Sequence, residues 1–284
     1  MEAIPTGDCI ALEPLVSRVL APNPSAFTFT GTQTHLVGTT DLAVIDPGPD
    51  DPAHIDAIVR AIAGRPVRAI VITHTHNDHS PGSRPLKAAT GAPIMGCAPL
   101  VLDALGPRAD AAFDRDYAPD RVMAEGDSIT GDGWTLIAVE TPGHTSNHLC
   151  FALPEAGALF TGDHVMGWST TVVSPPDGDM AAYMASLQKL QTRDDRRYYP
   201  AHGEPIDNPA QKVRGFLGHR RQREAQILRL LEEGVGTIPE LVERMYVGID
   251  RRLFGAAGGS VSAHLIDLRA RGLIVEDGAQ WRMI

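Results

Sequence analysis

Four potential metal ligands lie close together in one short segment of the sequence. The segment Thr73-His-Thr-His-Asn-Asp-His79 contains three histidines and one aspartate, and it directly follows an apolar run. Imidazole nitrogens and carboxylate oxygens are typical ligands of Zn²⁺ and similar transition metals. Alternating imidazoles can turn two rings onto one cation, while the following Asp-His pair faces a second. One loop cannot complete either site, so further ligands must come from elsewhere in the chain.

Three other segments supply single candidates in the same setting. Each follows a hydrophobic, strand-like run: Thr141-Pro-Gly-His144, Thr161-Gly-Asp163 and Pro200-Ala-His202-Gly203. A solitary histidine is usually a hydrogen-bonded loop residue, but the clustering and the repeated position after a strand favour a shared site. If the strands lie in packed sheets, seven side chains meet at one edge, which is enough for two metal ions. The seven are His74, His76, Asp78, His79, His144, Asp163 and His202.

The first segment resembles the hallmark His-X-His-X-Asp-His motif of the metallo-β-lactamase superfamily, which residues 74–79 match in full. The resemblance implies an α/β fold, a four-layer αββα sandwich with the site at one edge of two paired sheets. It also implies a first metal on His74, His76 and His144, a second on Asp78, His79 and His202, and a bridging Asp163.

The ligand set indicates hydrolysis. Two cations about 3.5–4 Å apart share a water, lower its pKa toward 7 and polarise the substrate oxygen under attack. Asp78 can both bind metal and orient the resulting hydroxide, so it is the candidate catalytic residue. The sequence shows no convincing Ser-His-Asp or Cys-His nucleophile. We expect two zinc ions, with iron and manganese as alternatives, because the ligand types do not exclude them.

Several polar residues near these segments have less certain roles. Asp46, in Val44-Ile-Asp-Pro-Gly48, resembles a family carboxylate that supports the ligands through hydrogen bonds. The segment 31–38 resembles a family strand but departs from it at Gln33 and His35, and His35 is expected to be a half-buried strand residue. His148 could contact substrate or make a structural hydrogen bond. His164 is not expected to bind metal.

The main body alternates strand-like and helical patterns, which is typical of an α/β fold. In the helix expected at 52–63, Ile55, Ile58, Val59 and Ile62 form one apolar stripe. A second helix is expected at 180–190. Strands are expected at 42–46, 67–73, 134–139, 148–153, 158–161 and 197–199.

The boundary of the main body is predicted near Pro209, giving a catalytic domain at 1–210 and a small domain at 211–284. In the second domain, helices followed by a hairpin around Asp277-Gly278 suggest a winged helix. This arrangement resembles the tail of the β-lactamase-like protein 2 group, which includes an endoribonuclease and carrier-protein thioesterases. The segment Gly255-Ala-Ala-Gly-Gly259 is expected to be a flexible turn.

Charge is unevenly distributed along the chain. Of 25 Lys+Arg and 35 Asp+Glu, residues 212–284 hold 12 and 9, a balance of +3, and residues 1–211 hold 13 and 26, a balance of −13. The first helix of the tail carries a basic cluster: Lys212, Arg214, Arg220, Arg221 and Arg223. This cluster could be solvated charge, an arm for RNA or a phosphopantetheine or CoA group, or a DNA-binding surface. The small net balance makes DNA unlikely.

These features favour a small ester, thioester or lactone as substrate. Single-stranded RNA cleavage is the main alternative, because a long polyanion would need a basic track beyond 212–223. A winged-helix nucleic-acid-binding protein is a further alternative, and β-lactamase action is expected at most as a side activity. No apolar run approaches membrane-spanning length and no export signal is evident, so a cytoplasmic location and no membrane partner are expected.

Overall fold

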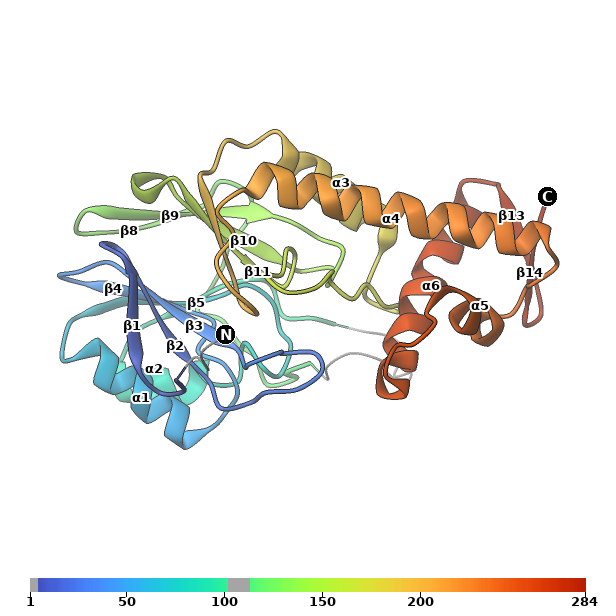
Figure 1. Cartoon of the computed structure of the whole chain (residues 1–284). Coiled ribbons are helices and arrows are strands. Elements are labelled where there is room, and N and C mark those ends of the chain that lie inside the picture. Colours follow the sequence, from blue (N-terminus) through green and yellow to red (C-terminus); the bar gives the residue numbers. More distant parts are fainter. Residues whose placement is uncertain (1–4, 102–112) are drawn as a thin grey trace.

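Two β-sheets form the centre of the main body (Figure 1) in the computed structural model, which describes residues 5–101 and 113–284. The seven-stranded sheet keeps sequence order: β1 (Cys9–Glu13), β2 (Val16–Leu20), β3 (Gln33–Val37), β4 (Leu42–Ile45), β5 (Val67–Ile72), β6 (Ile94–Gly96) and β7 (Arg121–Val122). The five-stranded sheet has the order β12 (Arg197–Pro200), β11 (Ala158–Gly162), β10 (Leu149–Leu153), β9 (Trp134–Glu140) and β8 (Ser128–Gly131).

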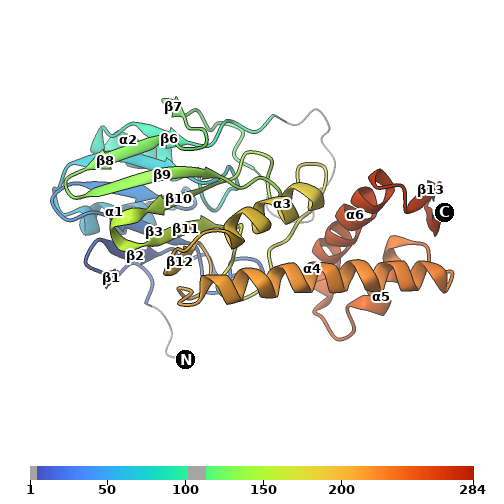
Figure 2. The ribbon, with the colours of Figure 1, turned by 90° about the horizontal axis from the view of Figure 1, so that it is seen from above.

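Helices cover the outer face of each sheet. The helices α1 (Pro52–Ile62) and α2 (Ser83–Thr90) lie against the seven-stranded sheet. On the opposite side, α3 (Met180–Gln191) and the start of α4 (Pro209–Glu232) cover the five-stranded sheet (Figures 1 and 2). The result is the predicted four-layer αββα sandwich.

The two sheets share one apolar core. Residues from both sheets contribute to it, among them Val44 and Ile70 from one sheet and Phe151 and Phe160 from the other, all at most 1% exposed. Because a strand buried on both faces needs apolar residues throughout, β4 and β5 read as nearly continuous aliphatic runs. This packing holds the two sheets as one rigid platform for the loops at their edge.

The helix α1 illustrates how local sequence fixes an element. Asp51 caps it by accepting a hydrogen bond from the backbone N–H of Ala53, and Pro52 occupies the first turn. Ile55, Ile58 and Ile62 are buried as predicted. Val59 is not: it is 39% exposed, because it lies beside the stripe that the sheet covers and not within it.

The register of the five-stranded sheet brings four chain segments to one edge. Leu149 at the start of β10 pairs with Glu140 at the end of β9, and Gly162 at the end of β11 pairs with Pro200 at the end of β12. Since β10 and β11 run antiparallel, the end of β11 also lies beside the start of β10. The loops that carry His144, Asp163 and His202 therefore leave the sheet at the same edge.

A second unit follows the main body. The helix α4 continues into it and packs with α5 (Ile238–Met245) and β14 (Gln280–Met283), while α6 (Phe254–Ala270) packs with α5 and with β13 (Ile274–Asp277), the hairpin partner of β14. Its own core includes Ile227, Leu241, Leu265 and Trp281. The helices and terminal hairpin form the predicted winged helix, and the hairpin turns at Gly278, whose φ is +63°. Two short 3₁₀ helices, Pro154–Ala156 and Arg251–Leu253, complete the described elements.

The prediction of a flexible turn at Gly255–Gly259 was wrong, because these residues form the first turns of α6. Helix propensity favours glycine outside helices, but close packing outweighs that preference at this position. A Cβ on Gly259 would lie 2.9 Å from Cβ of the buried Ser174, which belongs to the main body. Glycine thus lets α6 approach the main body closely.

The domain boundary stays a prediction, since α4 starts at Pro209 and runs without a break through the proposed limit at residue 210. Within residues 5–101 and 113–284, no helix combines the length and the apolar character needed to cross a membrane.

Candidate metal centre

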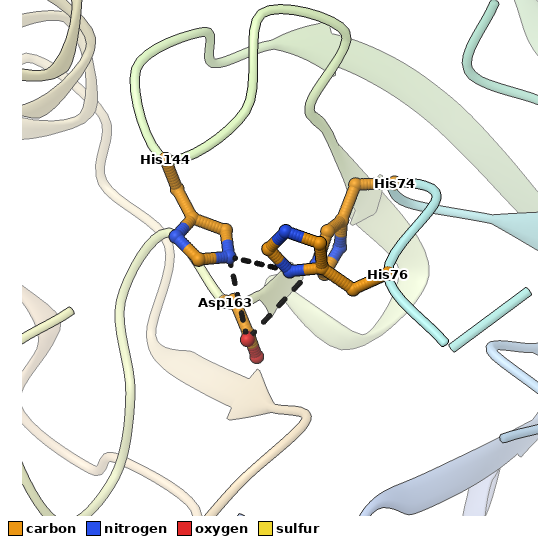
Figure 3. Close-up of side chains that lie close together, drawn as sticks. All are labelled: His74, His76, His144 and Asp163. Atoms are coloured by element: carbon orange, nitrogen blue, oxygen red, sulfur yellow. Dashed lines mark hydrogen bonds and ion pairs between the residues drawn. The ribbon is translucent and has the colours of Figure 1, made fainter. Parts of the chain in front are cut away.

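Four of the predicted ligands form a first cluster, which we call cluster A: His74, His76, His144 and Asp163. Figure 3 shows the three imidazoles converging on one point with the carboxylate below them. His76 Nδ1 lies 3.0 Å from His74 Nε2 and 3.1 Å from His144 Nε2. Nitrogens bound to one tetrahedral zinc at about 2 Å would be about 3.3 Å apart. The spacing of cluster A is therefore close to that of a metal-binding triad.

The remaining three residues, Asp78, His79 and His202, form cluster B. His202 Nε2 lies 3.2 Å from an oxygen of Asp78, and His79 Nε2 lies 3.5 Å from the same oxygen. Asp163 stands between the clusters. Its Oδ1 is 3.2 Å from His202 Nε2, and its Oδ2 is 3.6 Å from His144 Nε2. One carboxylate thus faces both clusters, as expected of a bridging ligand.

The outward nitrogens of the imidazoles are anchored to oxygen atoms. His144 Nδ1 lies 2.6 Å from the carbonyl oxygen of Val172, and His202 Nδ1 lies 3.2 Å from that of Gly31. Since a carbonyl oxygen can only accept, each Nδ1 donates and leaves Nε2 as the free lone pair that faces its cluster. These contacts set the tautomer and orientation that metal binding requires.

Asp46 has the supporting role that the sequence suggested. It accepts hydrogen bonds from the backbone N–H of Thr73 (2.9 Å) and from its hydroxyl (2.7 Å). His79 Nδ1 lies 2.9 Å from the carboxylate, so His79 is held with Nε2 in cluster B. Asp46 has φ +48°, a left-handed conformation that aspartate tolerates better than most residues. The same carboxylate therefore fixes both the start of the histidine loop and one of its rings.

The turn after β11 depends on glycine. Gly162 has φ +48°, and a Cβ at this position would lie 2.8 Å from both His148 Nε2 and Thr73 Oγ1. A larger residue would clash with the two groups that support the site. Glycine therefore allows Asp163 to enter the space between the clusters.

Negative charge dominates the electrostatics of cluster B. Burial alone lowers the pKa of His202, but Asp163 and Asp78 outweigh burial and raise it to about 10. Burial likewise opposes charge on His79, yet Asp78, Asp163 and Asp46 raise its pKa well above the usual value. An electric field that retains protons on buried imidazoles also favours a metal cation in their place.

The residues fit a pair of metal ions. His79 Nε2 and Asp163 Oδ1 are buried and 3.5 Å apart, yet neither makes a well-formed hydrogen bond among the described residues. Leaving such atoms unsatisfied is costly unless a ligand or an ion engages them. Nitrogen and oxygen donors in this number suit zinc, iron or manganese.

Three other histidines lie away from the convergent nitrogens. His35 is 3% exposed in β3, against Phe160 and Tyr199, and is thus more deeply buried than predicted. His148 is 1% exposed; its Nδ1 contacts Thr141 Oγ1 at 2.9 Å and its Nε2 accepts from the backbone N–H of Asp163. Of its two predicted alternatives, the structural hydrogen bond is correct. His164 belongs to neither cluster, as expected.

A cavity lies between the main body and the winged helix, so the tail forms one of its walls. It has a volume of about 320 Å³, within the usual range for a small-molecule site. Phe27, Met166 and Val172 line both this cavity and the small cleft that contains His76, Asp78, His144, Asp163 and His202. The cavity therefore lies directly beside the metal centre. The three shared residues are in loops that carry no periodicity or motif, so the sequence alone does not identify them as lining residues.

The basic cluster on α4 does not form one surface. Arg220 is 3% exposed, donates to the Thr171 carbonyl oxygen and lies over the Tyr183 ring at 5.2 Å. Arg223 is partly buried over the Tyr246 ring at 4.3 Å. Arg214 and Arg221 are exposed. The sequence carried a signal for this: Arg220 continues the i, i+3, i+4, i+7 spacing of Val213, Phe216 and Leu217.

Comparisons with known proteins agree with this architecture. Residues 28–202 match the Metallo-beta-lactamase superfamily, and residues 237–281 match the Beta-lactamase associated winged helix domain. A structure of a beta-lactamase domain protein from Burkholderia ambifaria superposes with a TM-score of 0.82 at 20% identity, covering 100% of this chain and 96% of that one.

Two curated relatives show similarity over most of their length. The Beta-lactamase-like protein 2 homolog of Caenorhabditis elegans is 36% identical over 78% of this chain and 72% of its own length. The atrochrysone carboxyl ACP thioesterase AgnL7 of Paecilomyces divaricatus is 34% identical over 80% of this chain and 68% of its own. With its paired clusters of histidine and aspartate, the chain belongs to the metallo-β-lactamase superfamily and is a dinuclear metal-dependent hydrolase.

Proposed function

We propose that the protein hydrolyses a small ester, thioester or lactone with two zinc ions held by clusters A and B. The observation that carries this proposal is the cavity of about 320 Å³ that lies beside the metal centre and shares Phe27, Met166 and Val172 with its cleft. Its walls include Phe27, Met166, Val172, Leu253 and Ala257, which suit an apolar acyl group. Such a group would place its carbonyl carbon beside Asp78 and Asp163.

The residues of the site would divide the work as follows. His74, His76 and His144 would hold one ion, Asp78, His79 and His202 the other, and Asp163 both. When bound, two such ions lower the pKa of water and polarise the carbonyl under attack.

Asp78 would orient the attacking water. Its side chain is 17% exposed, so it can reach a water in the cleft. Burial alone raises the pKa of Asp78, but His79 and His202 hold this pKa well below its usual range. The group therefore remains an ionised acceptor, able to receive a hydrogen bond from water and hold its oxygen toward the substrate.

A relative supports the thioester as the substrate class to test first, since AgnL7 is named as an acyl-carrier-protein thioesterase. Zinc is favoured by the nitrogen-rich donor set, and iron or manganese would fit the same atoms.

RNA is the competing substrate. A polyanion needs an exposed basic track, but Arg220 is buried and Arg223 lies against Tyr246. Of the five cations in the basic cluster, the exposed pair Arg214 and Arg221 would be left to contact a strand, while Arg229, further along α4, already pairs with Glu233. This distribution favours a small substrate, and DNA binding by the winged helix is disfavoured for the same reason.

The test compares substrate classes on metal-loaded protein. Thioesters, lactones, phosphodiesters, a β-lactam and single-stranded RNA are assayed with the wild type and with His76→Ala, which removes one ligand. We expect kcat/KM to be highest for a thioester, ester or lactone, and to fall at least about 100-fold in H76A. RNA cleavage faster than the best ester, lost in H76A, would overturn the proposed substrate class.

A further inference from the structure

The helix α4 contributes positively charged side chains to the wall of the interdomain cavity, and no carboxylate of the described residues neutralises them. Both Arg220 and Arg223 line the cavity. In the part of the chain that the structure describes, their hydrogen bonds go to the carbonyl oxygens of Thr171 and Met245 and to the side chains of His219 and Gln226. No acidic side chain pairs with either guanidinium there. Most of the other arginines in the described residues form an ion pair with an aspartate or glutamate, as Arg84 does with Asp114.

Arg220 is the more unusual of the two. It is 3% exposed, and its Nε has no hydrogen-bond partner among the described residues. A buried charge is ordinarily paired, because taking an ion out of water costs several kcal/mol that only a counter-charge or strong hydrogen bonds repay. One carbonyl oxygen and the face of Tyr183 compensate only part of that cost.

The pKa values of the two nearby histidines are lowered by burial and also by this uncompensated positive charge. Burial, together with Arg220 and Arg223, lowers the pKa of His219 to about 4. Burial and the same arginines lower the pKa of His264 to about 3. His219, which also lines the cavity, has a buried Nδ1 with no hydrogen-bond partner in the described chain. The neutral His219 ring accepts from Arg223 at Nε2, which leaves its Nδ1 as a donor beside the two guanidiniums.

The cavity lies beside the metal centre, with which it shares Met166 and Val172. Its walls also include apolar side chains such as Leu253 and Ala256, together with the two arginines. A molecule that fills it and has its reacting carbonyl at the metal centre could therefore also place an anion against the arginines.

We propose that this cavity selects acyl groups that carry a second, non-reacting carboxylate, and that Arg220 and Arg223 bind that carboxylate. The identity of the bond that is cleaved rests on the proposed function. The anion site itself does not depend on it. Arg223 is the specificity-determining residue open to test, because it is partly exposed and its replacement leaves the buried Arg220 in place.

The kinetic test uses two thioesters that differ in one charge: the N-acetylcysteamine thioester of adipic acid and that of adipic acid monomethyl ester. For wild-type holoenzyme, we expect kcat/KM for the carboxylate to exceed that for the methyl ester by about tenfold or more, as hydrogen bonds to charged groups allow. Arg223→Gln should reduce this ratio at least about threefold, because it removes one of the two guanidiniums proposed to contact the carboxylate. Arg223→Lys should restore part of the preference.

Arg221→Gln is the matched control, since it removes the same charge from an exposed position of α4 that does not line the cavity. It should keep the wild-type ratio. If the wild type shows no preference, or if R221Q reduces it as much as R223Q, the proposal is wrong. A preference for coenzyme A thioesters of the methyl ester, lost in R223Q, would instead assign the arginines to a phosphate on the thiol side and would also overturn it.

Calorimetric binding separates this proposal from the proposed function. Phenoxyhexanoate should bind the wild-type holoenzyme about tenfold more tightly than phenoxyhexanol, and R223Q should reduce that difference at least about threefold. If thioesters are not hydrolysed but this binding difference is found, the proposed function fails and the anion site stands. If R223Q binds phenoxyhexanoate as tightly as the wild type does, the carboxylate binds elsewhere and the anion site fails.

Discussion

In four of the five clustered histidines, one ring nitrogen faces a cluster and the other contacts an oxygen atom outside it: His74, His79, His144 and His202. In His79, one nitrogen contacts Asp46 and the other faces cluster B; in His144, one contacts the Val172 carbonyl oxygen and the other faces cluster A. An imidazole with only one nitrogen engaged could rotate or change tautomer, which would weaken metal binding. The oxygen partners are thus as much a part of the site as the residues that face the ions.

Replacing Asp78 should separate metal binding from turnover. Asp78→Ala leaves His74, His76 and His144 to hold one ion but removes the carboxylate that orients water. We expect kcat/KM to fall at least about 100-fold while elemental analysis still finds one or more metal ions per chain. Asp56→Ala, at an exposed position of α1, is the control. Near-normal activity of D78A would rule out this role for Asp78.

Asp46 should affect metal affinity without touching a metal. Asp46→Asn keeps the left-handed conformation accessible but weakens the hydrogen bonds to Thr73 and His79. We expect the affinity of cluster B for Zn²⁺ to fall about 10–100-fold, measured by competition with a chromogenic chelator. Unchanged affinity of both clusters would show that Asp46 supports only the backbone.

Residue types and spacing in the sequence are enough to predict which side chains meet, but not what holds them. The pattern is visible in the sequence alone: the motif at residues 74–79 and three single ligands, each directly after a strand-like run. The carbonyl oxygens of Val172 and Gly31 cannot be found this way, because every residue has a carbonyl and only the folded loops decide which one lies near a ring. For the same reason the sequence could not decide between the two roles of His148.

At the scale of elements, the strands were predictable because apolar runs such as Val67–Ile72 are short, β-branched and followed by polar loops. Elements that depend on contacts with distant parts of the chain were not. The glycine-rich start of α6 was misread as a turn, because its packing partner, Ser174, lies 85 residues earlier in the chain. The helix α4 packs with α3 at one end and with α5 and β14 further along, so no single apolar stripe describes its length.

The two adjacent glycines of α6 give a sharp test of its docking. A Cβ on Gly258 would meet only Ile238 at an ordinary 3.6 Å, so Gly258→Ala should stabilise the helix by up to about 1 kcal/mol. A Cβ on Gly259 would lie 2.9 Å from Ser174 Cβ, so Gly259→Ala should destabilise by about 1–3 kcal/mol. Thermal unfolding should show the melting temperature rising in G258A and falling in G259A. Equal shifts in the two variants would contradict the close approach of α6 to the main body.

At the scale of the whole molecule, Asp41 joins the two sheets. It follows the turn after β3, yet it accepts hydrogen bonds from the Trp134 indole and from the backbone N–H of Asp132, both on the β8–β9 hairpin. Arg68 also pairs with it. Burial alone raises the pKa of Asp41, but these hydrogen bonds and Arg68 outweigh it, and the net pKa is below the usual value.

This lowered pKa makes the contribution of Asp41 depend on pH. Its stabilising effect is present above the unfolded-state pKa of about 3.9 and is lost as pH falls through the lower folded-state value. Asp41→Asn should therefore cost about 1–3 kcal/mol in urea unfolding at pH 7, with the difference from wild type shrinking as the buffer is acidified below about pH 4. Asp56→Asn should show no such pattern. A difference between D41N and wild type that stays constant down to pH 2 would contradict the proposed linkage.

The proposed hydrolysis requires that clusters A and B bind two metal ions. Elemental analysis of metal-replete protein, combined with anomalous diffraction at the absorption edge of the metal found, tests that claim most directly. We predict two transition-metal ions per chain, with two anomalous peaks, one at His74, His76 and His144 and the other at Asp78, His79 and His202. Fewer than one ion per chain for every first-row metal after reconstitution, or peaks away from these residues, would contradict it.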